Sequence, residues 1–226
     1  MRSRLVLSLR TLLIALVALA PLAGCEETPT QPDRVSLPIM PLAVGNMWIG
    51  RSYGLDTLGG AIDIEADTLS IVSTESIAAE TWYRTSDGTL LANRADGLWW
   101  RSSSTAPATL IAKHPASVGE IFGRETARIL YPDTLDHEID SLVYGHVVIA
   151  VGTRLTVTAG TYDVNGYQEH LETFDGQVIT EDHELWMGDQ EFYSPGVGRV
   201  QQRRYQMTPD GKTQWGVWEL VEARLK

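Results

Sequence analysis

The most constraining feature of the sequence is a series of short β-prone runs, separated by turn-forming residues, that extends from Gly45 to the C-terminus. Four of the turns contain Asp-Gly, at residues 87–88, 96–97, 175–176 and 210–211. Asp-Gly between β-branched and aromatic flanks is a strong hairpin signal, because both residues tolerate a positive φ. The pattern therefore predicts a mainly β fold, an antiparallel meander of about ten to twelve strands.

A sheet of that size would curl into a half-barrel or an open barrel, or pair with itself as a sandwich, with few short helices. The segment from Thr126 to Tyr131 is ambiguous between helix and strand. Adjacent Trp99 and Trp100 must point to opposite faces of a strand. We therefore expect either that both faces are covered or that one concave face is lined with aromatic side chains and holds a ligand.

The first 24 residues have the composition of an export signal. Three arginines and no acid precede an apolar run at residues 12–20, which is shorter than the roughly 20 residues of a spanning helix. The signal ends in Leu-Ala-Gly-Cys at residues 22–25, which resembles the lipobox of bacterial lipoproteins. That resemblance implies cleavage before Cys25 and acylation of this residue, with palmitate among its chains, so that the lipid anchors the mature protein to a membrane.

Residues 25–41 are predicted to be a lipidated N-terminus and tether, since four prolines among polar residues oppose a helix. Residues 42–226 are predicted to form a single β-rich domain. Glu26 follows the lipobox at the position where, in enteric bacteria, an aspartate resembles an inner-membrane retention signal. By that analogy we expect a cell-envelope location at the outer membrane, facing the periplasm or the cell surface.

Charge and cysteine content exclude several classes of function. The chain carries a net charge of -11, and loss of the signal's three arginines takes it to -14. Such an excess of acid argues against nucleic acid as a partner and against electrostatic docking on anionic lipid. The excess of acidic residues is explained by the solubility that it gives a protein at a surface, and the alternative is that the acids bind cations. Cys25 is the only cysteine, so no thiol remains for a disulfide or a nucleophile.

Three short segments resemble a group of uncharacterised bacterial envelope lipoproteins: residues 41–48, ending Gly-Asn-Met-Trp, residues 159–164, Ala-Gly-Thr-Tyr-Asp-Val, and residues 192–200, which contain Pro-Gly-Val-Gly. Thr158 stands where the group has proline, and Tyr162 where it has phenylalanine. The resemblance implies an antiparallel sheet curled around a helix or a groove, distantly like the half-barrels of lipoprotein carriers. It implies no activity. The shared residues are turn formers, so we interpret them as folding determinants.

One hairpin could bring metal ligands together. If residues 175–176 form a two-residue loop, Phe174 pairs with Gln177, and counting outward gives the pairs His170–Glu181 and Gln168–His183. Two imidazoles and a carboxylate on one face could hold a divalent metal. A solvent-exposed polar face explains the same residues, and a one-residue slip would remove the cluster.

The opposite face of that hairpin sets Glu169 against Asp182, a like-charge contact that is costly unless it is hydrated, paired with arginine or bound to a cation. The acidic run at residues 133–140 reads as a solvated loop or edge strand, with calcium binding as the alternative. It lacks the ligand spacing of an EF-hand.

No nucleophile elbow, phosphate loop, zinc-protease motif or dinucleotide fingerprint occurs in the sequence. We therefore expect a non-enzymatic binding or assembly module without a cofactor or metal, anchored to the membrane by its lipid and contacting a hydrophobic ligand or an envelope protein. The candidate ligand-binding residues are Trp99, Trp100 and Trp186. Two alternatives stay open: a carrier or acceptor of lipid or lipoprotein, and a metal-dependent hydrolase using His170 and His183.

Overall fold

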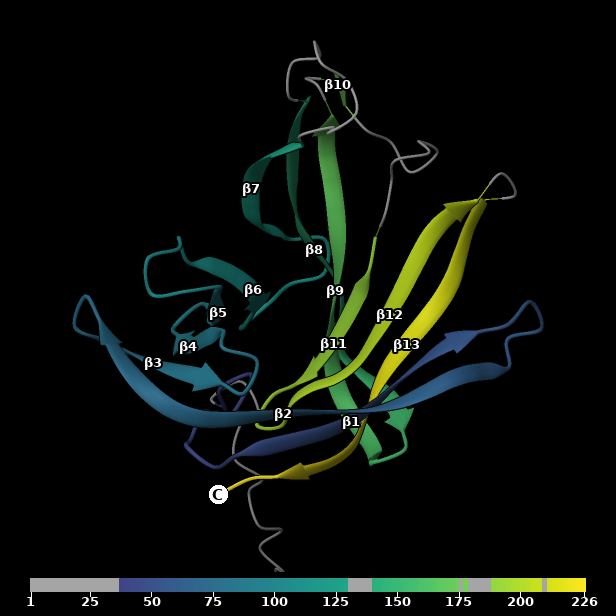
Figure 1. Ribbon diagram of the computed structural model, residues 1–226. Helices are drawn as coiled ribbons and strands as arrows, with labels where there is room; N and C mark the ends of the chain where they lie inside the picture. The colour runs from purple at the N-terminus through teal and green to yellow at the C-terminus, as the bar shows by residue number, and fades with distance from the viewer. Residues whose placement is uncertain (1–36, 130–139, 175–176, 179–187, 209–210) are drawn as a thin grey trace, which may run out of the picture. The chain divides into compact units, whose positions relative to one another are not determined.

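A computed structural model describes residues 37–129, 140–174, 177–178, 188–208 and 211–226, all within the unit Pro32–Lys226 (Figure 1). The described residues form strands and turns without a helix, as the turn chemistry predicts. None of them belongs to a helix long and apolar enough to cross a membrane. The strands are β1 (Met47–Leu55), β2 (Ala61–Ile77), β3 (Glu80–Thr85), β4 (Leu90–Arg94), β5 (Gly97–Arg101), β6 (Thr109–Lys113), β7 (Ile121–Ile129), β8 (Asp140–Val157), β9 (Gly160–Phe174), β10 (Gln177–Val178), β11 (Gln190–Ser194), β12 (Gly198–Thr208) and β13 (Gly211–Arg224).

All of these strands belong to one antiparallel sheet. Twelve follow one another in the order β6-β5-β4-β3-β2-β1-β13-β12-β11-β9-β8-β7, and the short β10 pairs beside β9. The sheet thus consists of two meanders joined by the pairing of β1 with β13, in which Met47 lies opposite Arg224. The predicted fold class and strand number are confirmed.

The order of the strands forces the sheet to curl. Strands β6 and β7 lie at the two ends of the path, yet only residues 114–120 connect them. A segment of that length spans at most about 25 Å, so the two edges must approach each other. Thr109 of β6 donates a hydrogen bond to Glu125 of β7. The result is a nearly closed barrel, not a sandwich.

One hydrophobic core occupies much of the interior of the barrel and draws residues from both meanders, among them Trp48, Ile71, Leu98, Val148 and Val200. Alternation along the strands decides which aromatics join it. Trp218 of β13 is buried in this core, whereas Trp215 is 42% exposed. On β3, Trp82 belongs to a separate cluster with Leu90 and Ala92 on the other face. The expected placement of aromatics on both faces is confirmed, and both faces of this region are covered.

Two of the three segments that resemble envelope lipoproteins contact each other. Residues 195–197 form the turn between β11 and β12, and the Nε1 of Trp48 donates a hydrogen bond to the carbonyl of Val197 at 2.5 Å. Asn46 is fully buried, donates to the Pro41 carbonyl at 2.7 Å and accepts from the Lys226 amide at 2.9 Å. These contacts account for the two motifs as folding determinants.

The structure decides two alternatives that the sequence left open, and it describes the end of the predicted tether. Residues 126–129 of the ambiguous segment belong to β7 and are therefore strand; residues 130–131 lie outside the described residues. The helix that the resemblance allowed inside the sheet is not found among the described residues, because core side chains fill that space. The last residues of the predicted tether are packed: Ile39 and Met40 are buried, and Asn93 donates to the Met40 carbonyl at 2.7 Å.

Candidate functional site

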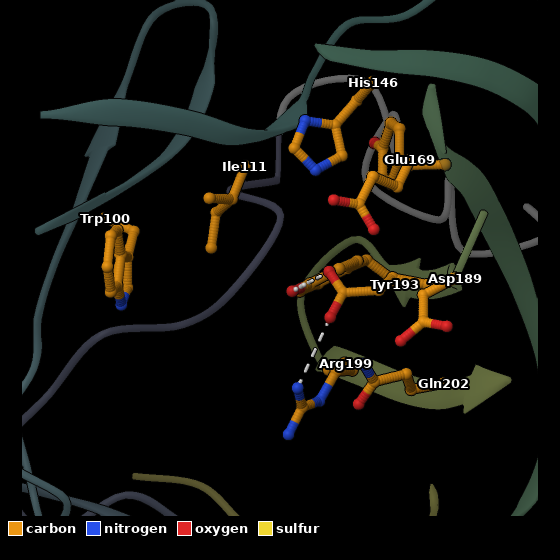
Figure 2. A pocket seen from close by; sticks show the side chains of 10 residues that line it. Trp100, Ile111, His146, Glu169, Asp189, Tyr193, Arg199 and Gln202 are labelled. Carbon is orange, nitrogen blue, oxygen red and sulfur yellow. Dashed lines mark hydrogen bonds and ion pairs between the residues drawn. The ribbon is translucent and has the colours of Figure 1, made fainter. Parts of the chain in front are cut away.

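The barrel contains a cavity of about 380 Å³ whose lining comes from both meanders. Trp100 of β5 and Ile111 of β6 supply one side, and residues of β8, β9, β11 and β12, with Asp189 just before β11, supply the rest (Figure 2). This volume is in the range of small-molecule sites in proteins, about 300–1,000 Å³. We call this cavity the barrel pocket.

Strand alternation selects the pocket residues. On β9, Tyr167 and Glu169 line the pocket, as do Glu191 and Tyr193 on the neighbouring β11. The register places Glu191 opposite Tyr167, so the two pairs lie side by side. Because successive side chains point to opposite faces, Gln168 and His170 face away from the pocket.

The pocket holds more carboxylates than cations. Glu191 accepts a hydrogen bond from the Tyr193 hydroxyl at 3.1 Å and pairs with Arg199 at 3.5 Å. The guanidinium of Arg199 also lies over the Trp218 ring, 4.5 Å from its centroid. Asp189 accepts from the Tyr205 amide at 3.1 Å. Arg199 is therefore the cation that balances part of this charge.

Glu169 differs from the other two carboxylates of the pocket in its partners. It is half-buried, and no described residue donates a hydrogen bond to its carboxylate or forms an ion pair with it. Burial raises the pKa of Glu169, and the carboxylates of Asp189 and Glu191 raise it further. A group with these surroundings can exchange a proton or accept a hydrogen bond from a ligand.

His146 closes the top of the pocket in Figure 2. Its ring stacks on Phe122 with centroids 5.4 Å apart, and its Nδ1 is buried without a hydrogen-bond partner among the described residues. Burial lowers the pKa of the imidazole, and Glu191 and Glu125 offset part of that effect. His146 is thus neutral at neutral pH and adds no positive charge to the pocket.

The tyrosines of the pocket have structural roles. The Tyr167 hydroxyl donates to the Lys113 carbonyl at 2.5 Å, which ties β9 to the end of β6 across the interior. Burial raises the pKa of Tyr167 and of Tyr193 well above the ordinary value for tyrosine. Both side chains therefore stay protonated and offer rings and hydroxyls, not charge.

The chain matches no protein family and no curated protein. A solved structure of a candidate lipoprotein from Parabacteroides distasonis ATCC 8503 is similar, with 12% sequence identity and a TM-score of 0.38. The similarity covers 83% of this chain and 99% of that chain.

The structure separates the three predicted ligand-binding tryptophans. Trp100 lines the barrel pocket. Trp99 faces the other side of β5, where its Nε1 donates to Asp96 at 2.8 Å and Arg94 lies 4.1 Å from the ring centroid. Trp99 is thus held against the cluster of Trp82, away from the pocket. Trp186 and the lipidation candidate Cys25 lie outside the described residues.

The predicted metal-binding hairpin is described only near its turn. Phe174 pairs with Gln177, as predicted. Further along β9, however, Gln168 pairs with Gln190 of β11, so its predicted pairing with His183 is wrong. Glu181 and His183 lie outside the described residues. Among the residues that are described, no group of three or more potential ligands is placed to hold a metal.

The sequence analysis missed most of the pocket residues. Glu169 appears there only as a costly like-charge contact, and His146 is not among the candidates. The available signal was the period-two alternation of an aromatic and an acid, Tyr167 with Glu169 and Glu191 with Tyr193. That alternation marks one face of a strand, but it does not show that the two strands are neighbours and line one pocket.

The raised pKa of Glu169 predicts a pH-dependent stability. The folded protein binds this proton more tightly than the unfolded chain, whose carboxyl has the ordinary value of 4.5, so stability is lost as the pH rises through the window above 4.5. Glu169→Gln removes that loss. At pH 7 we expect the variant to melt roughly 2–4 °C above the wild type, equivalent to about 1 kcal/mol, and at pH 4 to melt at the same temperature.

Circular dichroism melting at both pH values checks this expectation. Glu172→Gln is the matched control, because Glu172 lies on the same strand and pairs at 2.7 Å with Arg124, which is 62% exposed. Its loss should lower stability slightly at pH 7. A Glu169→Gln variant that melts at or below the wild-type temperature at pH 7 would contradict the assignment of an unpaired carboxylate.

Proposed function

We propose that this protein is a lipid-anchored cell-envelope protein that binds a small ligand in the barrel pocket and is not an enzyme. The observation that carries the binding proposal is the pocket itself, a cavity of about 380 Å³ with Trp100 on one side and an open carboxylate, Glu169, in its lining. Aromatic side chains beside convergent polar groups are typical of binding sites, and this pocket combines the two.

The anchor is proposed from the lipobox at residues 22–25 and the export signal before it. Cys25 would carry the acyl chains, and the residues after it would connect the lipid to the barrel. The outer membrane is the proposed address. Because Ile39 and Met40 are packed in the core, the connecting segment would end before residue 39.

The pocket lining favours this proposal over the two alternatives. A carrier's acyl chain would have to lie against Glu169, Asp189 and Glu191, and burying charges against hydrocarbon is costly. No observation favours the metal-dependent hydrolase, since His170 faces away from the pocket and its proposed partners lie outside the described residues.

Expression of the full chain in a Gram-negative host with labelled palmitate tests the anchor. We expect the label in the wild type and in the membrane fraction, and its complete loss, with transfer to the soluble fraction, in Cys25→Ala. Cys25→Ala leaves the described barrel untouched, so its melting temperature serves as the control. A wild-type protein without label, or a Cys25→Ala variant that keeps it, would refute the anchor.

A further inference from the structure

We infer that the barrel pocket recognises an organic cation, an ammonium or guanidinium group attached to an apolar or aromatic body. This inference rests on the proposed binding function and specifies its ligand. Three features of the pocket carry it: its charge, the arrangement of its lining, and the state of Glu169.

The charge of the pocket calls for a cation. Glu169, Asp189 and Glu191 face one cavity, whereas Arg199 is paired to Glu191 at 3.5 Å and His146 is neutral. Like charges gathered in a half-buried site repel one another, and a bound cation relieves that repulsion. The net charge of the whole chain, -11, also draws cations toward the protein.

The arrangement of the lining selects an organic cation over a metal ion. In Figure 2, Trp100 and Ile111 lie on one side of the cavity, and Glu169 and Asp189 lie on the other. The described side chains do not converge into a metal-binding group. A ligand with a charged end and an apolar body would place its ammonium against the carboxylates and its body against the indole, where an aromatic face also attracts cations.

We expect Glu169 to determine the preference of the pocket for a cation over a neutral ligand. Asp189 and Glu191 already accept hydrogen bonds from the protein, Asp189 at 3.1 Å from the Tyr205 amide and Glu191 at 3.1 Å from Tyr193. The carboxylate of Glu169 has no such donor among the described residues. An N–H donor on the ligand would supply the missing hydrogen bond, in the charge-assisted form that is the stronger kind.

Titration calorimetry on the detergent-solubilised full-length protein at pH 7.5 tests the inference. The probes are matched in size and differ in charge: phenethylammonium and n-hexylammonium, their neutral analogues 2-phenylethanol and 1-hexanol, and the anion 3-phenylpropanoate. We expect each amine to bind at least tenfold more tightly than its alcohol, and no binding of the anion. Glu169→Gln should weaken amine binding at least tenfold and alcohol binding by much less, whereas Glu172→Gln, on the outer face of β9, should change neither.

The outcomes separate this inference from the proposed function. Alcohols that bind as tightly as the amines would overturn the cation preference and leave a binding pocket. Amine binding that Glu169→Gln does not weaken would overturn the assignment of this pocket as the cation site. Absence of binding by every probe up to millimolar concentration would overturn the inference. If a Trp100→Ala variant bound every probe as tightly as the wild type, the probes would bind outside the barrel pocket, and the binding function of the pocket would fall with the inference.

Discussion

Replacing Gly97 by alanine is expected to destabilise the protein by about 3 kcal/mol or more, since it combines backbone strain with a steric clash. Gly97 opens β5 after the Asp96 turn and has a φ of +139°, a conformation that L side chains rarely adopt. A Cβ placed on Gly97 would lie 2.1 Å from the carbonyl oxygen of Ala112, on the paired strand β6. Because that oxygen is backbone, the clash can be relieved only by separating the two strands.

Gly160 provides a matched control for this substitution. It has the same φ of +139° at the turn between β8 and β9, but the nearest atom to its added Cβ would be the Tyr162 hydroxyl at 3.8 Å, an ordinary contact. Gly160→Ala should therefore cost only the backbone strain, about 1–2 kcal/mol. Urea unfolding of both variants measures the difference. Equal losses would show that β6 gives way without cost and that the clash does not decide the stability of this hairpin.

The local part of the fold is readable from the sequence because turn chemistry acts over two or three residues. Asp87-Gly88 and Asp96-Gly97 connect β3, β4 and β5 as predicted. The closure of the barrel is not readable in this way. It depends on the pairing of Met47 with Arg224 at opposite ends of the domain, and on a connection of residues 114–120 between the two edge strands. The residues within a single hairpin specify neither this pairing nor this connection.

The pocket was less predictable than the fold for the same reason. Trp100 was a candidate because two adjacent tryptophans must diverge, but alternation alone could not tell which of them faces inward. Glu169 and Glu191 become neighbours only because β11 pairs with β9, with Glu191 opposite Tyr167. Extending the hairpin from residues 175–176 gave Gln168 the wrong partner, because β11 occupies that edge of β9 in place of the residues directly after the turn.

Truncation of Trp48 to alanine is expected to cost about 4 kcal/mol, at the upper end of core substitutions. Trp48 is 1% exposed and packs in the main core at the pairing of the two meanders. Its removal would leave a cavity and would also leave the Val197 carbonyl without the indole donor that lies 2.5 Å away. The space around that indole is tight, because a Cβ on Gly198 would lie 3.0 Å from the Trp48 Nε1.

Phenylalanine at the same position separates packing from the hydrogen bond. Trp48→Phe keeps most of the apolar volume and loses the donor, so we expect a loss of about 2 kcal/mol. Trp218→Phe is the control: Trp218 is equally buried in the same core, but its Nε1 donates at 3.0 Å to Asp67, an exposed carboxylate that water can solvate in its place. The control should therefore lose less.

If Trp48→Phe lost no more than Trp218→Phe, the turn at residues 195–197 would hold its shape without the tryptophan, and the two motifs would owe their contact to packing alone. A larger loss at Trp48 would show that a single hydrogen bond joins the first strand of one meander to the turn that begins β12 in the other.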